Sequence, residues 1–176
     1  MSAEKRIIRR PIAGLVILMG VILMTGSLVL GYLDRSIANP EATKLPKSIA
    51  GFSLNTATYG PDAVAEITRL HGKEFPIDSG AMGMYGDTNQ ISLWVAGFAT
   101  RIVAKQIVSA MEEKIALGNS PFIPTEQKNI GYRTIYRLDG MGQKHIYFQS
   151  GNLVLWLAAD PKVADEAIQK ILEVYP

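Results

Sequence analysis

The feature that most constrains this chain is an uncharged, mostly aliphatic segment that runs from Pro11 to Leu33. At about 1.5 Å per residue, a helix over these positions is about 34 Å long, which is enough to cross a hydrocarbon core about 30 Å thick. Proline suits the first turn of such a helix, where its missing N–H costs no hydrogen bond. We therefore predict a single transmembrane helix over 11–33, followed by a separate folded part.

The charges that flank this segment predict its orientation. Four basic residues lie within 1–10, whereas only the pair Asp34 and Arg35 follows closely on the other side. Because cytoplasmic flanks are enriched in Lys and Arg, we expect 1–10 to be cytoplasmic and the chain after the helix to be periplasmic or extracellular. A cleavable signal peptide, cut after Ala38, is the alternative. The apolar segment is much longer than a signal-peptide core, so we predict a retained anchor.

Small residues on the predicted helix are candidates for contact with other membrane helices. Ser27 and Gly31 form a small-xxx-small pair, and Gly26 lies beside them. Such residues allow two helix backbones to approach each other closely. Gly26, Ser27 and Gly31 are therefore candidate interface residues; the alternative is that Gly is simply common in membrane helices.

The composition excludes several classes of protein. Of the 176 residues, 48% are hydrophobic and 19% are charged, and there is no Cys. These fractions exclude an intrinsically disordered chain. Without Cys, the chain has no disulfides, Cys-ligated zinc, iron–sulfur clusters or thiol nucleophiles. The net charge is +2 for the whole chain and +3 for 1–33, so the remainder carries −1 and nucleic-acid binding is not expected.

After the helix, the pattern predicts a linker over 34–47 and one α+β domain over 48–176. Hydrophobic periodicity and turn residues predict helices over 60–72, 100–118 and from 160 onward, and strands over 49–56, 81–85, 91–98, 132–138, 144–149 and 153–158. This order favours an antiparallel sheet with helices packed on one face, ferredoxin-like in its first half. The strands over 91–98 and 153–158 are apolar on both faces, so we expect them at the centre of the sheet.

A glycine-rich strand over 81–85 is predicted to form an edge of this sheet. Glycines in strands often mark bulges or the close approach of another backbone. We expect this strand to lie flat against a partner subunit.

Candidate catalytic residues are few. Ser79 or Ser150 can be combined with His145 and Asp139 to form a triad, but there is no Gly-x-Ser-x-Gly motif. The expected role for His145 is a partly exposed side chain on a sheet face. We expect no enzymatic activity and no cofactor.

The most specific alternative to a protein without a cofactor is a copper site. Thioether and imidazole ligands suit Cu(I), and the chain offers Met82, Met84, Met141 and His145. The competing interpretation is that Met fills an irregular core.

Tyrosine and arginine residues of the later strands form a second set of interface candidates. Tyr132, Tyr136 and Tyr147 are expected to share one sheet face, with Arg133 nearby. Tyr and Arg are enriched at interface hot spots. A solvated sheet face is the alternative.

These observations predict a non-catalytic, single-pass membrane protein. The first hypothesis is an accessory subunit that braces the extracytoplasmic face of a larger membrane complex, with other membrane subunits and the membrane itself as its partners. A short linker keeps the domain close to the membrane, which suits that role. The alternatives are an extracytoplasmic ligand-binding or sensory module and a copper-handling protein.

Overall fold

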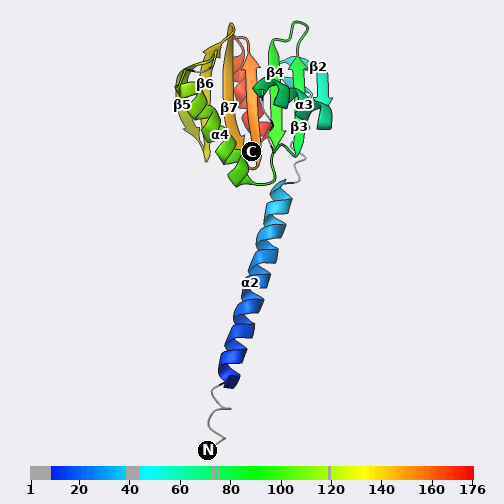
Figure 1. Cartoon of the computed structure of the whole chain (residues 1–176). Coiled ribbons are helices and arrows are strands. Elements are labelled where there is room, and N and C mark those ends of the chain that lie inside the picture. The colour runs from blue at the N-terminus through cyan, green and yellow to red at the C-terminus, as the bar shows by residue number, and fades with distance from the viewer. Residues whose placement is uncertain (1–8, 39–43, 73, 75, 119) are drawn as a thin grey trace, which may run out of the picture. The chain divides into compact units, whose positions relative to one another are not determined.

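The structure, a computed structural model, describes residues 9–38, 44–72, 74, 76–118 and 120–176. The chain divides into two compact units, Met1–Ile37 and Ala38–Pro176 (Figure 1). The first unit is built on helix α2 (Arg9–Ala38), which extends beyond the predicted end at residue 33. The second unit contains eight strands and the three remaining described helices, α3 (Gly60–His71), α4 (Arg101–Ala116) and α5 (Ala164–Val174).

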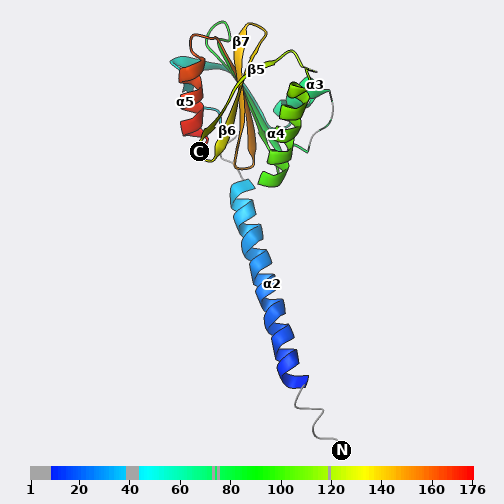
Figure 2. The ribbon, with the colours of Figure 1, turned by 90° about the vertical axis from the view of Figure 1, so that its left-hand side faces the viewer.

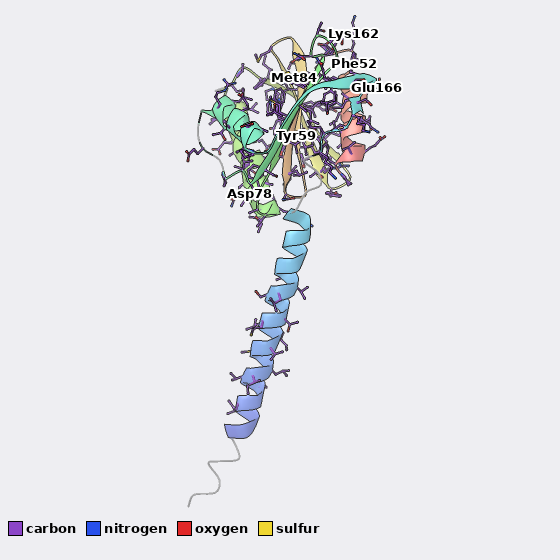
Figure 3. The ribbon with its side chains drawn as sticks, turned by 90° about the vertical axis from the view of Figure 1, so that its right-hand side faces the viewer. Phe52, Tyr59, Asp78, Met84, Lys162 and Glu166 are labelled. Atoms are coloured by element: carbon purple, nitrogen blue, oxygen red, sulfur yellow. The ribbon has the colours of Figure 1, made fainter. Side chains whose placement is uncertain are left out.

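Helix α2 contains one segment apolar enough to cross a membrane, Ile12–Gly31, with a mean hydropathy of 2.5. The side chains of this segment project outward along the helix and none is buried (Figure 3). Its one polar contact is local, because the Thr25 hydroxyl donates to the carbonyl of Val21 at 2.7 Å. The helix therefore presents an apolar surface on every side.

All eight strands form one antiparallel sheet in the order β1-β2-β3-β4-β8-β7-β6-β5. Strands β4 and β8 lie at its centre, as their apolar sequences predict. The strands are β1 (Ser48–Ile49), β2 (Phe52–Tyr59), β3 (Ser79–Tyr85), β4 (Ile91–Gly97), β5 (Ile123–Ile130), β6 (Arg133–Gly140), β7 (Gln143–Ser150) and β8 (Leu153–Ala159).

Helices cover both faces of the sheet, so the prediction of helices on one face is wrong (Figure 2). Helix α5 packs on one face through residues such as Ile168 and Ile171. Helices α3 and α4 pack on the other through Ile67 and Val108. Successive strand residues point to opposite faces, and β4 and β8 are apolar at nearly every position, so each face needs its own cover.

The first half of the domain is also not ferredoxin-like. In a split β-α-β unit the two strands that flank a helix are parallel. Here β2 and β3, which flank α3, are antiparallel neighbours, with Tyr59 opposite Ala81. After α3, the chain therefore begins β3 beside the end of β2, and β3 runs back along β2.

Three local differences from the predicted elements have simple causes. The predicted first strand is two strands, because Ala50 and Gly51 turn the chain with φ of 47° and 79°. Strand β5 is exposed along almost its whole length, so it carries no hydrophobic alternation to detect. Helix α5 begins at Ala164 without a side-chain cap, because Asp160 belongs to the preceding turn.

Strand β3 is internal rather than an edge, which corrects the role expected for 81–85. Its glycines make room for neighbours inside the same domain. A Cβ on Gly80 would lie 3.0 Å from the Val64 nitrogen on α3, and a Cβ on Gly83 would lie 2.9 Å from Leu45 Cδ1. The close approach is therefore intramolecular at both glycines, and it involves backbone at Gly80 but side chains at Gly83.

Part of the predicted linker belongs to the domain. Leu45 is buried in the core on the α5 face. The hydroxyl of Tyr85 donates to the Pro46 carbonyl at 3.0 Å, and that of Tyr175 donates to the Lys44 carbonyl at 3.2 Å. Residues 39–43 of the predicted linker lie outside the described residues.

Candidate functional site

A cleft of about 580 Å³ lies between α3, α4 and the sheet. Its floor is formed by β4, β8 and β7, and the residues before β5 and the β6–β7 turn complete its walls. Most of its lining is aliphatic or aromatic, including Ile67, Leu70, Trp94, Phe98, Met111, Ile115, Phe122, Met141 and Trp156. Leu70 and Met141 are 59% and 79% exposed, so apolar side chains remain accessible at its rim.

A row of aromatic rings crosses the sheet beneath α4. The strand register aligns Trp94, Trp156, Tyr147 and Tyr136 on four adjacent strands. Tyr147 stacks on Trp156 at 5.4 Å and on Tyr136 at 4.6 Å between ring centroids. The Tyr136 hydroxyl donates to Glu112 of α4 at 3.0 Å, and burial together with this carboxylate raises the pKa of Tyr136 to about 12. This row holds the Trp156 ring of the cleft floor in place, and Trp94 lies beside it in the strand register.

His145 is part of the same wall and is buried, not partly exposed as predicted. The indole N–H of Trp156 donates to His145 Nδ1 at 3.1 Å, so Nε2 carries the proton and donates to the Gly140 carbonyl at 3.0 Å. The ring of Phe122 packs against the imidazole with centroids 4.6 Å apart. Both ring nitrogens are therefore used in holding the cleft together.

This arrangement predicts a pH-dependent stability. Burial lowers the pKa of His145, although the Gly140 carbonyl and the Asp139 charge act in the opposite direction. An unfolded histidine has a pKa of about 6.5, so on acidification the unfolded state takes up the proton first. The free energy of unfolding is therefore at its full value above about pH 6.5 and falls as the pH drops towards the folded-state pKa.

Urea unfolding of the wild-type chain and the His145→Gln variant between about pH 7.5 and pH 5 tests this prediction. The wild-type chain should lose more stability over this interval than the variant does. His71→Gln is the matched control, because His71 is an exposed residue at the end of α3. Equal pH slopes for wild type and His145→Gln would contradict the prediction.

The lining contains more hydrogen-bond donors and positive charge than negative charge. Lys114, in the last turn of α4, is the lysine of the lining, and none of the described residues that line the cleft is a carboxylate. The indole nitrogen of Trp94 is buried and has no hydrogen-bond partner in the described part of the chain. The cleft therefore presents a lysine, and no carboxylate among its described residues, on a mostly apolar surface.

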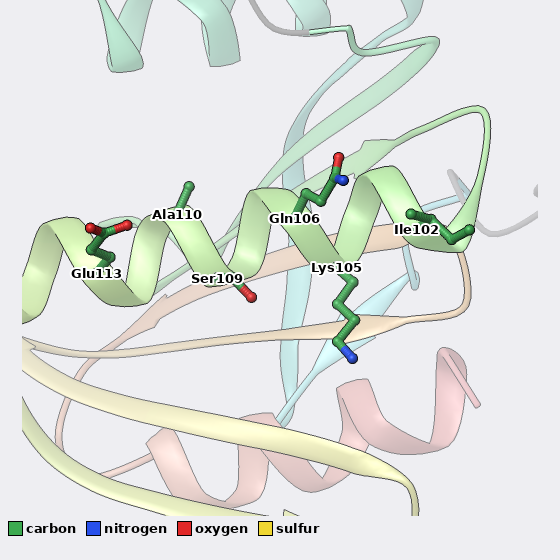
Figure 4. A pocket seen from close by; sticks show the side chains of 6 residues that line it. All are labelled: Ile102, Lys105, Gln106, Ser109, Ala110 and Glu113. Atoms are coloured by element: carbon green, nitrogen blue, oxygen red, sulfur yellow. The ribbon is translucent and has the colours of Figure 1, made fainter.

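A second hollow, of about 530 Å³, lies on the outer surface of α4. Its six lining residues all belong to this helix: Ile102, Lys105, Gln106, Ser109, Ala110 and Glu113 (Figure 4). No second element forms a wall among the described residues, so this surface does not enclose a ligand.

The residues considered for copper do not come together. Met84 and His145 lie in one row across the sheet, separated by Ser92 and Ala158 on the intervening strands. At about 4.8 Å per strand this row places them about 14 Å apart. Met82 lies on the same strand, β3, as Met84, which is labelled in Figure 3. Met141 lies in the turn that leads into β7, the strand of His145. Met82 and Met84 are therefore on a different part of the sheet from Met141 and His145.

The tyrosine and arginine candidates are also dispersed. Tyr147 is buried and Tyr136 is covered by its contact with α4, so neither presents a free interface ring. Arg133 lies on the α5 face of the sheet, where its Nη1 donates to the carbonyls of Leu172 and Tyr175 at the end of α5. Tyr132 alone of the predicted set is strongly exposed, at 78%.

The remaining candidates are the small residues of α2 and the residues of the possible triad. Of the small residues on α2, Gly26 and Gly31 would have no atom within 4 Å of a Cβ added to them, and Ser27 is exposed. Of the possible triad residues, Ser150 is separated from His145, because Ser150 bonds to the chain end on the α5 face whereas His145 lies on the opposite face.

Of the candidate residues named from the sequence, Met141 and His145 line the cleft, but the cleft itself was not predicted. Trp94 and Trp156 are the two tryptophans of the chain, and both occupy the middle of strands predicted to be central. That coincidence is the one signal of the cleft that the sequence carries.

Comparisons with known proteins assign no family. No family model matches the chain, and no curated protein matches it. A solved structure described as a GTP binding regulator from Thermotoga maritima is 13% identical and covers 76% of this chain and 82% of its own, with a TM-score of 0.43. A likeness at this level carries no functional argument.

Proposed function

We propose that the chain is a membrane-anchored, non-catalytic binding protein whose folded domain takes an apolar ligand into the cleft between α3, α4 and the sheet. The observation that carries this proposal is the cleft itself. Its volume of about 580 Å³ lies in the range of about 300–1,000 Å³ typical of small-molecule sites. A mostly apolar lining with a few polar groups is also typical of such sites.

The two tryptophans make this proposal directly measurable. Because both line the cleft, energy transfer from tryptophan to phenylnaphthylamine, an uncharged apolar dye, reports on the cleft without other donors. We expect saturable transfer with the full chain in proteoliposomes. Ala96→Phe, which places a ring in the cleft, should weaken binding about tenfold or more.

The matched control is Ala110→Phe, which adds the same ring on the outer surface of α4 and should bind the dye as the wild type does. Melting curves of both variants report whether each remains folded. Non-saturable transfer, or equal binding by both variants, would contradict a ligand site in this cleft.

Anchoring is the second part of the proposal. The segment Ile12–Gly31 supports it through its hydropathy and full exposure, and the basic residues within 1–10 favour a cytoplasmic N-terminus with the domain outside. A domain held there would encounter apolar molecules that leave or enter the membrane.

A second candidate function is the accessory subunit of a membrane complex. It is favoured by the bare surface of α2, on which Gly26, Ser27 and Gly31 leave room for another helix. Replacing all three by Leu should remove co-purifying membrane proteins after mild detergent extraction, whereas Ile22→Leu with Val29→Leu should retain them. Unchanged co-purification of the triple variant would reject this role for the small residues.

A further inference from the structure

We infer that the cleft selects a single-chain amphiphile with an acidic head group, of the long-chain fatty acid class, and that Lys114 binds its carboxylate. This inference rests on the proposed function and goes further by naming the chemical class of the ligand. It follows from the distribution of charge and hydrogen-bonding groups over the lining.

Lys114 is an exposed lysine that lines the cleft, and it differs in this position from the paired lysines of the domain. Lys144 pairs with Asp139 at 2.7 Å, and Lys170 pairs with Glu173 at 3.3 Å. No ion pair of Lys114 occurs within the part of the chain that the structure describes, and no described carboxylate shares the cleft with it. Its position in the last turn of α4 favours a cation through the helix dipole, with or without a ligand.

The other polar groups of the lining do not compensate for this charge. His145 is neutral in the observed hydrogen-bond pattern, with both nitrogens engaged. The Ser120 hydroxyl is used locally, because it donates to the Phe122 carbonyl and accepts from the Phe122 N–H. The N–H of Trp94 also has no acceptor among the described residues, but its nitrogen is buried. Lys114 therefore favours a ligand that brings negative charge.

The apolar part of the lining fits the rest of such a molecule. Besides Lys114, the lining contains Met111 and Ile115 of α4, the two tryptophans of the floor and Phe122. Flexible Met side chains and flat aromatic rings suit a methylene chain, which has no directional contacts of its own. A volume of about 580 Å³ suits one chain better than a two-chain phospholipid.

The test compares two probes that differ only in the head group, a dibrominated octadecanoic acid and the corresponding dibrominated octadecanol. Bromine quenches tryptophan emission on contact, and both tryptophans line the cleft. The full chain is placed in phosphatidylcholine proteoliposomes at a pH where the fatty acid is ionised. We expect the acid to bind about tenfold more tightly than the alcohol, as one charge-assisted hydrogen bond implies.

Lys114→Gln should abolish the preference for the acid over the alcohol, and Lys114→Arg should restore it. Lys105→Gln removes the same charge from the outer surface of α4 and should have no effect. Equal binding of acid and alcohol by the wild type, or a preference that survives Lys114→Gln, overturns the inference while leaving the proposed function intact. Failure of both probes to quench saturably overturns the proposed function as well.

Discussion

Replacing Trp156 by Ala is expected to lower the free energy of unfolding by about 3 kcal/mol or more. The substitution removes the ring that packs between Phe122 at 5.0 Å and Tyr147 at 5.4 Å. It also removes the N–H that His145 Nδ1 accepts, which leaves a buried nitrogen without its partner. Loss of packing and loss of the hydrogen bond therefore act together at one position.

Trp156→Phe separates these two effects. It keeps an aromatic ring in the stack, removes the hydrogen bond to His145 and loses only the smaller part of the ring packing, so we expect a loss of about 1–2 kcal/mol. Urea unfolding of each full-length variant, followed by circular dichroism, measures both values. If Trp156→Ala costs no more than Trp156→Phe, the ring does not hold the cleft floor together.

The second large effect is expected at Gly80, where β3 passes beneath α3. A Cβ at this position would lie 3.0 Å from the Val64 nitrogen and 3.1 Å from Val64 Cγ2. Backbone cannot rotate aside as a flexible side chain does, so α3 must shift. We expect Gly80→Ala to cost about 2 kcal/mol and Gly80→Val to cost more, in the range found for overpacked cores.

Because α3 also forms a wall of the cleft, both Gly80 variants should weaken binding of phenylnaphthylamine. Gly20→Ala is the matched control, since nothing lies within 4 Å of a Cβ at Gly20 on α2. This control should leave the unfolding of the domain unchanged. A Gly80→Val variant as stable as the wild type would show that α3 does not pack on β3 as closely as described.

Much of the sheet could be predicted because its signals are local. Strands β4 and β8 are short apolar runs between turns, and helix α4 carries a Thr100 cap, whose hydroxyl accepts from the Val103 N–H at 3.3 Å. Gly72, with φ of 66°, ends α3 as its position predicts. These features depend on a few neighbouring residues and need no knowledge of the tertiary structure.

The placement of helices and the cleft could not be predicted in the same way. Which face a helix covers depends on the chain's path between elements, and both faces of β4 and β8 are equally apolar in sequence. Trp94 and Trp156 become neighbours only through pairing of strands about sixty residues apart in sequence. Gly80 and Gly83 do mark positions where other parts of the chain come close to the strand. The residues that come close, Val64 and Leu45, become their neighbours only in the folded domain.

A crystal structure of the chain with bromonaphthalene shows whether the cleft binds an apolar ligand. We expect an anomalous bromine peak inside the cleft, against the rings of Trp94 and Trp156. Bromine peaks confined to other surfaces, with the cleft unoccupied at a saturating concentration of the probe, would contradict it.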